Sequence, residues 1–564
     1  MSDSSKIWRA EGVLLGAAAG DALGWPQELR GGIVGGKKAR REIEPQPRYR
    51  SWTRNGGSRF SGTYKDPVAA GEYSDDTQLI CALSRAYLHG DEWFDWFTRI
   101  ELPAWKLYQR GGGRAVLAAA SAWSERRPPW YAENSTRSRE SVQRYREAGG
   151  NGAAMRVAPH VLARQNDESM LHAVLLDAAS THGHPRALVG ALVYASALAA
   201  ALTADQTIGY GDLIEAARHG LRSPDWVEYA LRDLHFFDGI EVADFLRRWE
   251  IANDEVLDKF DRVGRAVRRG AMANDSSVLE EIGAIGREGG AGTTTAAAAI
   301  YLASRGAARP LSGLLAAAFV DEADTDTLAS MVGGLLGAVH GSRWLGDLTG
   351  VQDADYLREI ARALAGGAGH YGLWHDVNPP HASRELIARL PHLERGDRGL
   401  FPDGREFEVD AIGVLPSSDF LRGRFRLSDG QTVYVDSRIR DRADARARDA
   451  APAVPPPRSA KIDARIRIVL EAADLGRAAR FYSGLLAKDT VIRDGEFELT
   501  PGVVIRQGAS KSSPADGALV DVRVDDLARV AAFLGATVDR SGAEAEVRGS
   551  DPDGRRLRLR QFRG

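Results

Sequence analysis

The hydrophobic pattern divides the chain into regions of different periodicity. Up to about residue 390, Ala- and Leu-rich blocks such as AVLAAASAWSE, HAVLLDAAS, TAAAAIYLAS and LSGLLAAAF recur between breaks marked by Gly, Asp and Pro. Such blocks are typical of helices, and strand patterns are scarce among them. The pattern predicts an all-α domain over residues 1–392, with a polar, Gly-rich loop from about residue 29 to 72.

After residue 395 the pattern changes to short alternating segments. The segments are REFEVDAIGV, RGRFRLSDG and QTVYVDSRI. A PDG turn precedes the first and an SDG turn precedes the last, which predicts a small β unit at 393–440. The Pro-, Ala- and Arg-rich stretch that follows, RADARARDAAPAVPPPRSA, is typical of an extended or partly helical linker. We place this linker at 441–460.

The last part of the chain, residues 461–564, contains one pattern twice. Two segments each predict a strand, a loop and a helix: IRIVLEAADLGRAARFYSGLLAKDT and ALVDVRVDDLARVAAFLGATVDR. This repetition predicts an α+β domain that arose by internal duplication.

Composition narrows the class of protein without naming a partner. The 564 residues are enough for three or four domains, and 74 basic against 77 acidic residues leave a net charge of −3, which gives no sign of nucleic-acid binding. Cys81 is the single cysteine, so an internal disulfide, a thiolate zinc site and an iron–sulfur cluster are excluded. The longest apolar run, at 190–204, is shorter than a bilayer span and predicts a buried helix, and the N-terminal residues lack a signal pattern. A cytoplasmic protein without membrane contact is expected.

Candidate chemistry begins with two adjacent acids in AGEYSDDTQL, residues 70–79. Asp75 and Asp76 repel each other when both are ionised, unless a cation or a helix N-terminus compensates them. Ser74 can cap a helix that starts there, so an acidic capping motif is one interpretation.

A second acidic cluster, DEADTDT at 321–327, offers the same ligand chemistry before another helical pattern. Hydroxyl and carboxylate oxygens without a thiolate suit Mg²⁺, Mn²⁺ or Ca²⁺ better than zinc, and four carboxylates suit two divalent ions. The six candidate metal ligands are Ser74, Asp75, Asp76, Asp324, Asp326 and Thr327.

These two clusters, together with GVLLGAAAGDALGWPQE (12–28), GGNGAAMRVAP (149–159) and STHGHP (180–185), resemble the ADP-ribosylglycohydrolase family over about residues 10–350 and in the same order. The resemblance implies an all-α bundle with a dinuclear magnesium centre that hydrolyses the N- or O-glycosidic bond between ADP-ribose and an acceptor. It implies that the six residues above hold two Mg²⁺ (or Mn²⁺), with Asp75 and Asp326 as catalytic residues. Glu28 aligns with an acid that some members place near the scissile ribose as a gate or catalytic group, so the resemblance implies a catalytic role for it; a solvated loop acid is the alternative.

The same resemblance implies an ADP-ribose site at Asn151, Gly152 and Met155, where glycines permit close backbone approach. A tight turn before a helix is the alternative for this stretch. His182 is expected near the phosphates or ribose, or else in a structural position, and Arg156 is either a phosphate contact or an internal ion-pair partner. The chain departs from the family pattern at Glu322 and Ala323, where two glycines are usual. The Gly-rich stretch GREGGAGTTT (286–295) lies where the family often lines the site's rim.

Two further stretches have weaker signals. KKARREIEPQPRYRSWTR (37–54) combines basic residues with Tyr49 and Trp52, so contact with nucleic acid is possible, although a solvated loop or the mouth of a substrate pocket is the more common context. In the C-terminal part, ADLGRAARFYSGLLA (473–487) and SDPDGRRLRLRQ (550–561) resemble the glyoxalase/bleomycin-resistance, or vicinal-oxygen-chelate, fold. Because that segment has no histidine, it implies a binding module more than a metalloenzyme.

The resulting hypothesis is a Mg²⁺-dependent hydrolase that reverses ADP-ribosylation of a protein or small-molecule acceptor and releases ADP-ribose. An ADP-ribose-binding immunity or sensor protein that acts by stoichiometric binding is one alternative, and a hydrolase of a free ADP-ribose derivative is another. Arginine, serine, a nucleic-acid base and a metabolite all remain open as acceptors.

Overall fold

The chain folds into two compact units, residues 1–442 and 443–564, which are described separately. The computed structural model describes residues 3–28, 44–58, 62–132, 135–164, 167–204, 208–238, 241–286, 288–366, 377–416 and 418–439 of the first unit, and residues 468–472, 496–500, 503–507, 519–524, 538, 546–550 and 556–561 of the second.

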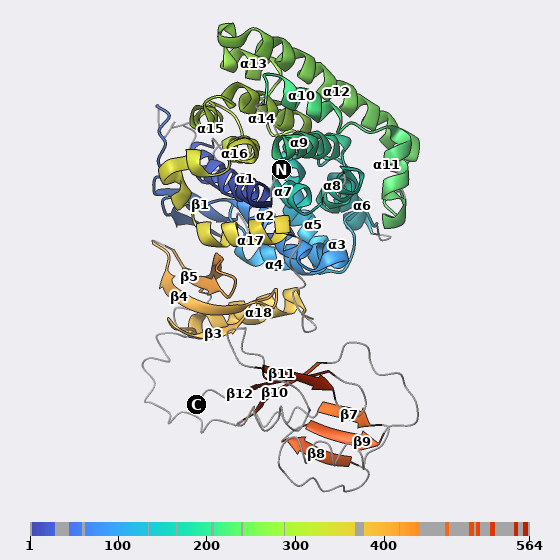
Figure 1. Ribbon diagram of the computed structural model, residues 1–564, viewed down its shortest axis with the longest axis vertical. Helices are drawn as coiled ribbons and strands as arrows, with labels where there is room; N and C mark the ends of the chain where they lie inside the picture. The colour runs from blue at the N-terminus through green and yellow to red at the C-terminus, as the bar shows by residue number, and fades with distance from the viewer. Residues whose placement is uncertain are drawn as a thin grey trace. The chain divides into compact units, whose positions relative to one another are not determined.

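Helices build most of the first unit (Figure 1), as the Ala- and Leu-rich pattern predicts. They are α1 (Asp3–Gly24), α2 (Asp75–Tyr87), α3 (Trp93–Trp96), α4 (Leu102–Tyr108), α5 (Arg114–Ser124), α6 (Thr136–Arg146), α7 (Ala158–Ala163), α8 (Asp167–Thr181), α9 (Pro185–Thr203), α10 (Asp212–Arg218), α11 (Pro224–Leu231), α12 (Val242–Arg268), α13 (Asp275–Glu281), α14 (Gly292–Gly306), α15 (Pro310–Ala318), α16 (Thr325–His340), α17 (Ala354–Gly366) and α18 (Pro379–Arg389), with short 3-10 turns at η1 (Trp25–Gln27) and η4 (Asn151–Arg156). Helix α9 contains the long apolar run. It is long and apolar enough to cross a bilayer, but 72% of its most apolar window is buried inside the bundle, as predicted for a core helix.

The contact between α1 and α16 fixes the position of the site. Glycines of α1 lie directly against the backbone of α16, so that a Cβ at Gly16 would lie 2.2 Å from the carbonyl oxygen of Gly333 and one at Gly24 would lie 2.1 Å from that of Thr325. Thr325 also donates a hydrogen bond of 2.9 Å to the carbonyl of Gly24. Without side chains between them the two backbones approach closely, which brings the C-terminal end of α1 beside the N-terminal end of α16.

The predicted loop at 29–72 is wrong in its second half. Strands β1 (Trp52–Ser58) and β2 (Gly62–Val68) form an antiparallel hairpin there, with Trp52 opposite Val68. Trp52 packs edge-on against Trp25 at 5.2 Å between ring centroids. The strands carry Pro67 and several glycines, which weaken any alternation in the sequence, so packing against η1 favours the hairpin where local preference does not. Residues 29–43 of that prediction lie outside the described residues.

The small β unit forms as predicted, as an antiparallel sheet in the order β3-β4-β5-β6. Its strands are β3 (Arg398–Leu400), β4 (Glu406–Val414), β5 (Phe420–Leu427) and β6 (Thr432–Arg438), with a register shift between Val409 and Ala411. One face of the sheet is buried in the same hydrophobic core as the helices, with Phe425 and Val435 fully covered. The sheet therefore belongs to the same compact unit as the bundle; the domain boundaries given above stay predictions.

The second unit contains two three-stranded sheets with the same topology. Sheet β7-β9-β8 consists of Ile468–Ala472, Val503–Gln507 and Glu496–Thr500, and sheet β10-β12-β11 consists of Leu519–Val524, Arg556–Gln561 and Glu546–Ser550. In each, the first strand pairs parallel with the third, and the second pairs antiparallel with the third. This equivalence supports the predicted duplication. The linker at 441–460, the stretch 473–487 and residues 551–555 lie outside the described residues.

Candidate metal and substrate site

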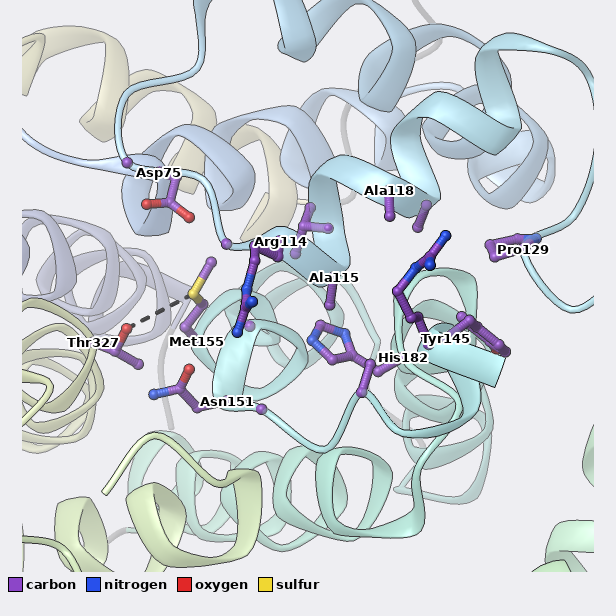
Figure 2. A pocket seen from close by; sticks show the side chains of 18 of the residues that line it. Asp75, Arg114, Ala115, Ala118, Pro129, Tyr145, Asn151, Met155, His182 and Thr327 are labelled. Atoms are coloured by element: carbon purple, nitrogen blue, oxygen red, sulfur yellow. Dashed lines mark hydrogen bonds between the residues drawn. The ribbon is translucent and has the colours of Figure 1, made fainter. Parts of the chain in front are cut away.

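A cavity of about 620 Å³ opens where α2, α5, η4 and α16 meet. Most of the predicted site residues line it, and Figure 2 shows Asp75, Asn151, Met155 and Thr327 at one end and His182 toward the other. The predicted residues that the cavity brings together are Glu28, Asp75, Asp76, Asn151, Gly152, Met155, His182, Asp324, Asp326 and Thr327. Ser74 does not line the cavity; it is the N-cap residue of α2, directly before Asp75.

The first acidic motif is both a helix cap and part of this site. Ser74 caps α2, its Oγ accepting a hydrogen bond of 3.4 Å from the backbone N–H of Asp76. Asp75 and Asp76 occupy the first turn, where the helix dipole favours negative charge. The capping interpretation and the ligand interpretation are therefore compatible, because the cap places both carboxylates at the cavity.

Asp21 of α1 holds the first turn of α2 through hydrogen bonds. It was not identified from the sequence. Its carboxylate accepts hydrogen bonds from the N–H of Ser74 at 2.9 Å, and from the N–H and Oγ1 of Thr77 at 3.0 and 2.6 Å. Burial raises the pKa of Asp21, against the opposing effect of these hydrogen bonds. One acid in the otherwise apolar stretch VLLGAAAGDALG was the signal that could have identified it.

The second acidic motif contacts the first through Thr327 and Asp76, which both line the cavity. Asp324 precedes α16 and Asp326 lies in its first turn. Single ligand atoms of Glu28, Asp324 and Asp326 all lie within 4.8 Å of one another. Thr327 donates a hydrogen bond of 3.2 Å from its Oγ1 to Asp76 Oδ2, which connects α16 to α2 directly.

Asp76 is a buried acid among other acids. The side chain is 2% exposed, and its Oδ1 has no hydrogen-bond partner among the described residues. Burial, and then the negative charges of Asp326, Asp21, Asp75 and Asp324, raise its pKa well above the usual range. A buried carboxylate oxygen without a partner is costly unless a cation or a proton satisfies it. Carboxylate and hydroxyl donors fit a hard divalent ion, so these residues fit the predicted metal centre.

The two Gly-rich stretches of the sequence lie side by side at the wall of the cavity. The N–H of Asn151 donates to the carbonyl of Gly290 at 2.9 Å, and that of Gly292 donates to the carbonyl of Gly149 at 3.0 Å. Asn151 also donates from Nδ2 to Asp324 Oδ2 at 3.1 Å. The loop that was expected to hold ADP-ribose is therefore joined to the acidic end of the cavity.

Of the two histidines and the arginine in this region, one lines the cavity and two have structural positions. His182 lines the cavity and is 2% exposed; burial lowers its pKa to about 3, so the ring is neutral at physiological pH. His184 caps α9 through its Nδ1, which accepts from the N–H of Arg186 at 3.1 Å. Arg156 is fully buried and pairs with Asp177 at 3.1 Å, which is the internal ion pair and excludes a phosphate contact.

The departure at Glu322 has a visible backbone consequence. Glu322 has φ of +57°, a left-handed conformation that glycine adopts without strain and other residues adopt rarely. The carbonyl of Glu322 accepts from the N–H of Gly286 at 2.9 Å, so the turn is held against the second Gly-rich stretch. Glu322 therefore occupies a backbone conformation that glycine would adopt without strain.

Sequence reasoning also missed the other wall of the cavity. Arg114, at the first position of α5, projects between the acidic end and His182 (Figure 2), and no carboxylate of the described residues forms an ion pair with it. Beyond it, α5 presents a small-residue face beside Tyr145 and Pro129, formed by Ala115, Ala118, Ala119 and Ala122. The signal for Arg114 was its place directly after the glycines of QRGGGRA, before a helical pattern.

The fold and the acidic cavity define a helical protein with a candidate metal site, and comparison with known proteins specifies the family. The model of the ADP-ribosylglycohydrolase family matches residues 2–372. The chain belongs to the ADP-ribosylglycohydrolase family. A search of curated proteins found no match. Among solved structures, the chain is similar to one titled "ADP-ribosylglycohydrolase-related protein complex", at 22% identity over 64% of this chain and 99% of that one, with a TM-score of 0.38.

Proposed function

We propose that this protein is a Mg²⁺- or Mn²⁺-dependent hydrolase that cleaves the glycosidic bond between ADP-ribose and an acceptor. Family membership supports hydrolysis of an ADP-ribose linkage. The observation that carries the metal dependence is Asp76, a buried carboxylate surrounded by other acids, with one oxygen lacking a partner among the described residues.

In this proposal the metals are held by Ser74, Asp75, Asp76, Asp324, Asp326 and Thr327. Bound divalent ions supply Lewis acidity, which orients ribose hydroxyls and lowers the pKa of a bound water. The side chain of Glu28 is partly exposed and has a ligand atom within 4.8 Å of those of Asp324 and Asp326, so it can accept a proton at the edge of the acidic cluster. The carboxylates also stabilise positive charge that develops on the ribose as the bond breaks.

The rest of the cavity fits the remainder of an ADP-ribosyl group. Arg114 provides a positive charge next to the acidic end, where a diphosphate would follow the metal-bound ribose. The alanine face of α5 and the ring of Tyr145 offer an apolar surface for a purine. A cavity of about 620 Å³ is large enough for a nucleotide-sized ligand.

The direct test measures release of ADP-ribose from modified peptides. We expect turnover with Mg²⁺ or Mn²⁺, loss on addition of EDTA, and loss of at least a hundredfold in the Asp326→Asn variant, because the ligand charge is removed while the side-chain shape is kept. A matched control is Asp275→Asn, which removes a carboxylate that accepts from Tyr301 outside the cavity. Full turnover by the Asp326→Asn protein in EDTA would contradict the proposal.

The acceptor is identified by a substrate panel. Arginine-, serine- and nucleobase-linked ADP-ribose and free ADP-ribose derivatives are incubated with the protein and examined by mass spectrometry. Repeated turnover of one class supports the hydrolase. Binding of ADP-ribose at one equivalent, without release from any substrate, would support the stoichiometric sensor or immunity protein instead.

For the second unit we propose a vicinal-oxygen-chelate-like binding module without catalytic metal. The two sheets of equal topology support a duplicated βα-type architecture, and the absence of histidine in residues 461–564 removes the usual ligand of such metalloenzymes. Equilibrium dialysis with Mn²⁺, Zn²⁺ and Fe²⁺ on an Asp76→Asn, Asp326→Asn chain tests this: stoichiometric binding that persists would contradict a metal-free module.

A further inference from the structure

Glu72 lies two residues before the predicted ligand Ser74 and is held by a strand that is distant in sequence. Its carboxylate accepts a hydrogen bond from Tyr434 Oη of β6 and another, of 2.5 Å, from Arg110 Nη1. Glu72 is 9% exposed and Arg110 is 3% exposed, so these contacts are protected from solvent. The backbone entering the metal-ligand turn is therefore fixed from the side of the β sheet.

A second connection joins the next residue to the same strand. Tyr73 donates from its Oη to Asp353 Oδ2 at 2.7 Å, and the backbone N–H of Thr432 donates to the same oxygen at 2.9 Å. Gln352 adds a bond of 3.0 Å from its Nε2 to the carbonyl of Thr432, while its own N–H donates to the carbonyl of Gly71 at 2.9 Å. Residues 71–73 are thus anchored to β6 at two positions.

Arg110 extends this support to the other side of the site. Its guanidinium lies over the ring of Tyr434 at 4.8 Å and over the ring of Trp25 at 5.5 Å. Trp25 begins the short turn that leads to Glu28. Arg110 therefore contacts Glu72, which is two residues before Ser74, and Trp25, which is three residues before Glu28.

We propose that β6 is a positioning element of the metal centre and that Tyr434 and Glu72 are its positioning residues. The sheet β3–β6 begins at Arg398, beyond residue 372 where the family match ends. The inference rests on the proposed function only in that a divalent ion binds Asp75 and Asp76. In this view the sheet is part of the catalytic unit, and its contacts set how tightly the turn at residues 74–76 holds metal.

The experiment measures Mn²⁺ affinity of the full chain by titration calorimetry for wild type and Tyr434→Phe. The variant removes one hydroxyl and keeps the ring beneath Arg110. We expect Mn²⁺ binding about three- to tenfold weaker, with an unchanged number of sites. Loss of a group that bonds a ligand directly typically costs ten- to a hundredfold, and the effect here should be at or below that range because Tyr434 acts through Glu72 and the backbone. Tyr301→Phe is the matched control. It removes a bond of 2.6 Å from Tyr301 on α14 to the carboxylate of Asp275 on α13, and should change affinity less than twofold.

Glu72→Gln provides an independent variant, since the amide oxygen still accepts from Tyr434 while the ion pair with Arg110 is lost. Near-ultraviolet circular dichroism and thermal unfolding in EDTA confirm that each variant is folded. If wild type binds Mn²⁺ and both Tyr434→Phe and Glu72→Gln bind it with wild-type affinity, the positioning role is overturned. If wild type itself binds no Mn²⁺, the metal dependence in the proposed function fails, which is a distinguishable result.

Discussion

Two clusters of buried acids in the first unit differ in how their charge is balanced. At the junction of the hairpin β1–β2 and the sheet, the carboxylates of Asp66, Glu72 and Asp436 contact the guanidinium groups of Arg54, Arg110 and Arg422. The arginines lower the pKa of Asp66, although burial opposes them. At the cavity, by contrast, burial and four neighbouring acids raise the pKa of Asp76.

The difference shows how a candidate metal site can be distinguished electrostatically from a structural ion-pair cluster. A structural cluster contains its own counter-charges and is complete once the chain has folded. A carboxylate that is affected mainly by burial and by like charges needs a cation or a proton to offset its charge. Burial alone does not separate the two, since Asp66 is 0% and Asp76 is 2% exposed.

The largest expected effect is that of the substitution Asp66→Asn on the free energy of unfolding. The substitution keeps the shape of the side chain but leaves Arg54, Arg110 and Arg422 without their shared carboxylate. We expect the free energy of unfolding to fall by about 3–5 kcal/mol, the usual cost of breaking a buried ion pair. Urea unfolding monitored by tryptophan fluorescence measures it. A loss below about 1 kcal/mol would show that the cluster is not stabilised by charge pairing.

Adding metal should act on the other cluster alone. A divalent ion at a hundred times its dissociation constant should raise the free energy of unfolding by about 2.7 kcal/mol, because it binds the folded chain and not the unfolded one. Thermal unfolding with MnCl₂ and with EDTA measures this effect. The Asp66→Asn protein should still show an increment, and an absent increment in wild type would contradict the metal site.

Asp76→Asn should change the free energy of unfolding in the opposite direction to Asp66→Asn. In EDTA we expect stability to rise by about 1–2 kcal/mol, because one of several mutually repelling carboxylates is removed. The metal-induced increment should disappear at the same time. Unfolding curves of the two Asp→Asn proteins, with and without Mn²⁺, make a complete comparison, and destabilisation of Asp76→Asn in EDTA would refute the charge argument.

The smallest expected effect is the contribution of His182 to the pH dependence of stability. The pKa of His182 is lowered from its ordinary 6.5 to about 3 in the folded protein by burial, and further by the charge of Arg156. The unfolded chain therefore binds a proton below pH 6.5 that the folded chain does not, so stability is present above this pH and falls as pH falls toward 3. Wild type should lose about 1 kcal/mol more than His182→Gln between pH 6.5 and about pH 5.5. Equal losses in urea unfolding would contradict the buried neutral state.

Much of the candidate site was predictable because its residues are clustered locally. Ser74, Asp75 and Asp76 lie in one helix start, and Asp324, Asp326 and Thr327 lie at another, so each motif has its own capping signature. The internal role of Arg156 could not be chosen in advance, since only the position of Asp177 on α8 distinguishes an ion pair from a phosphate contact. The hairpin at 52–68 was missed because its pairing depends on Trp25 and the sheet.

The sequence by itself determined the helical class of the first unit, the small sheet, and the residue types of the acidic motifs, because periodicity and capping are local properties of the chain. Tertiary structure decided which acids gather at the cavity and which acids pair with arginines. That choice depends on close packing of α1 against α16 and on β6 reaching Glu72 from 362 residues away. Charge balance in a buried cluster depends on every neighbour in three dimensions, and no local pattern contains this information.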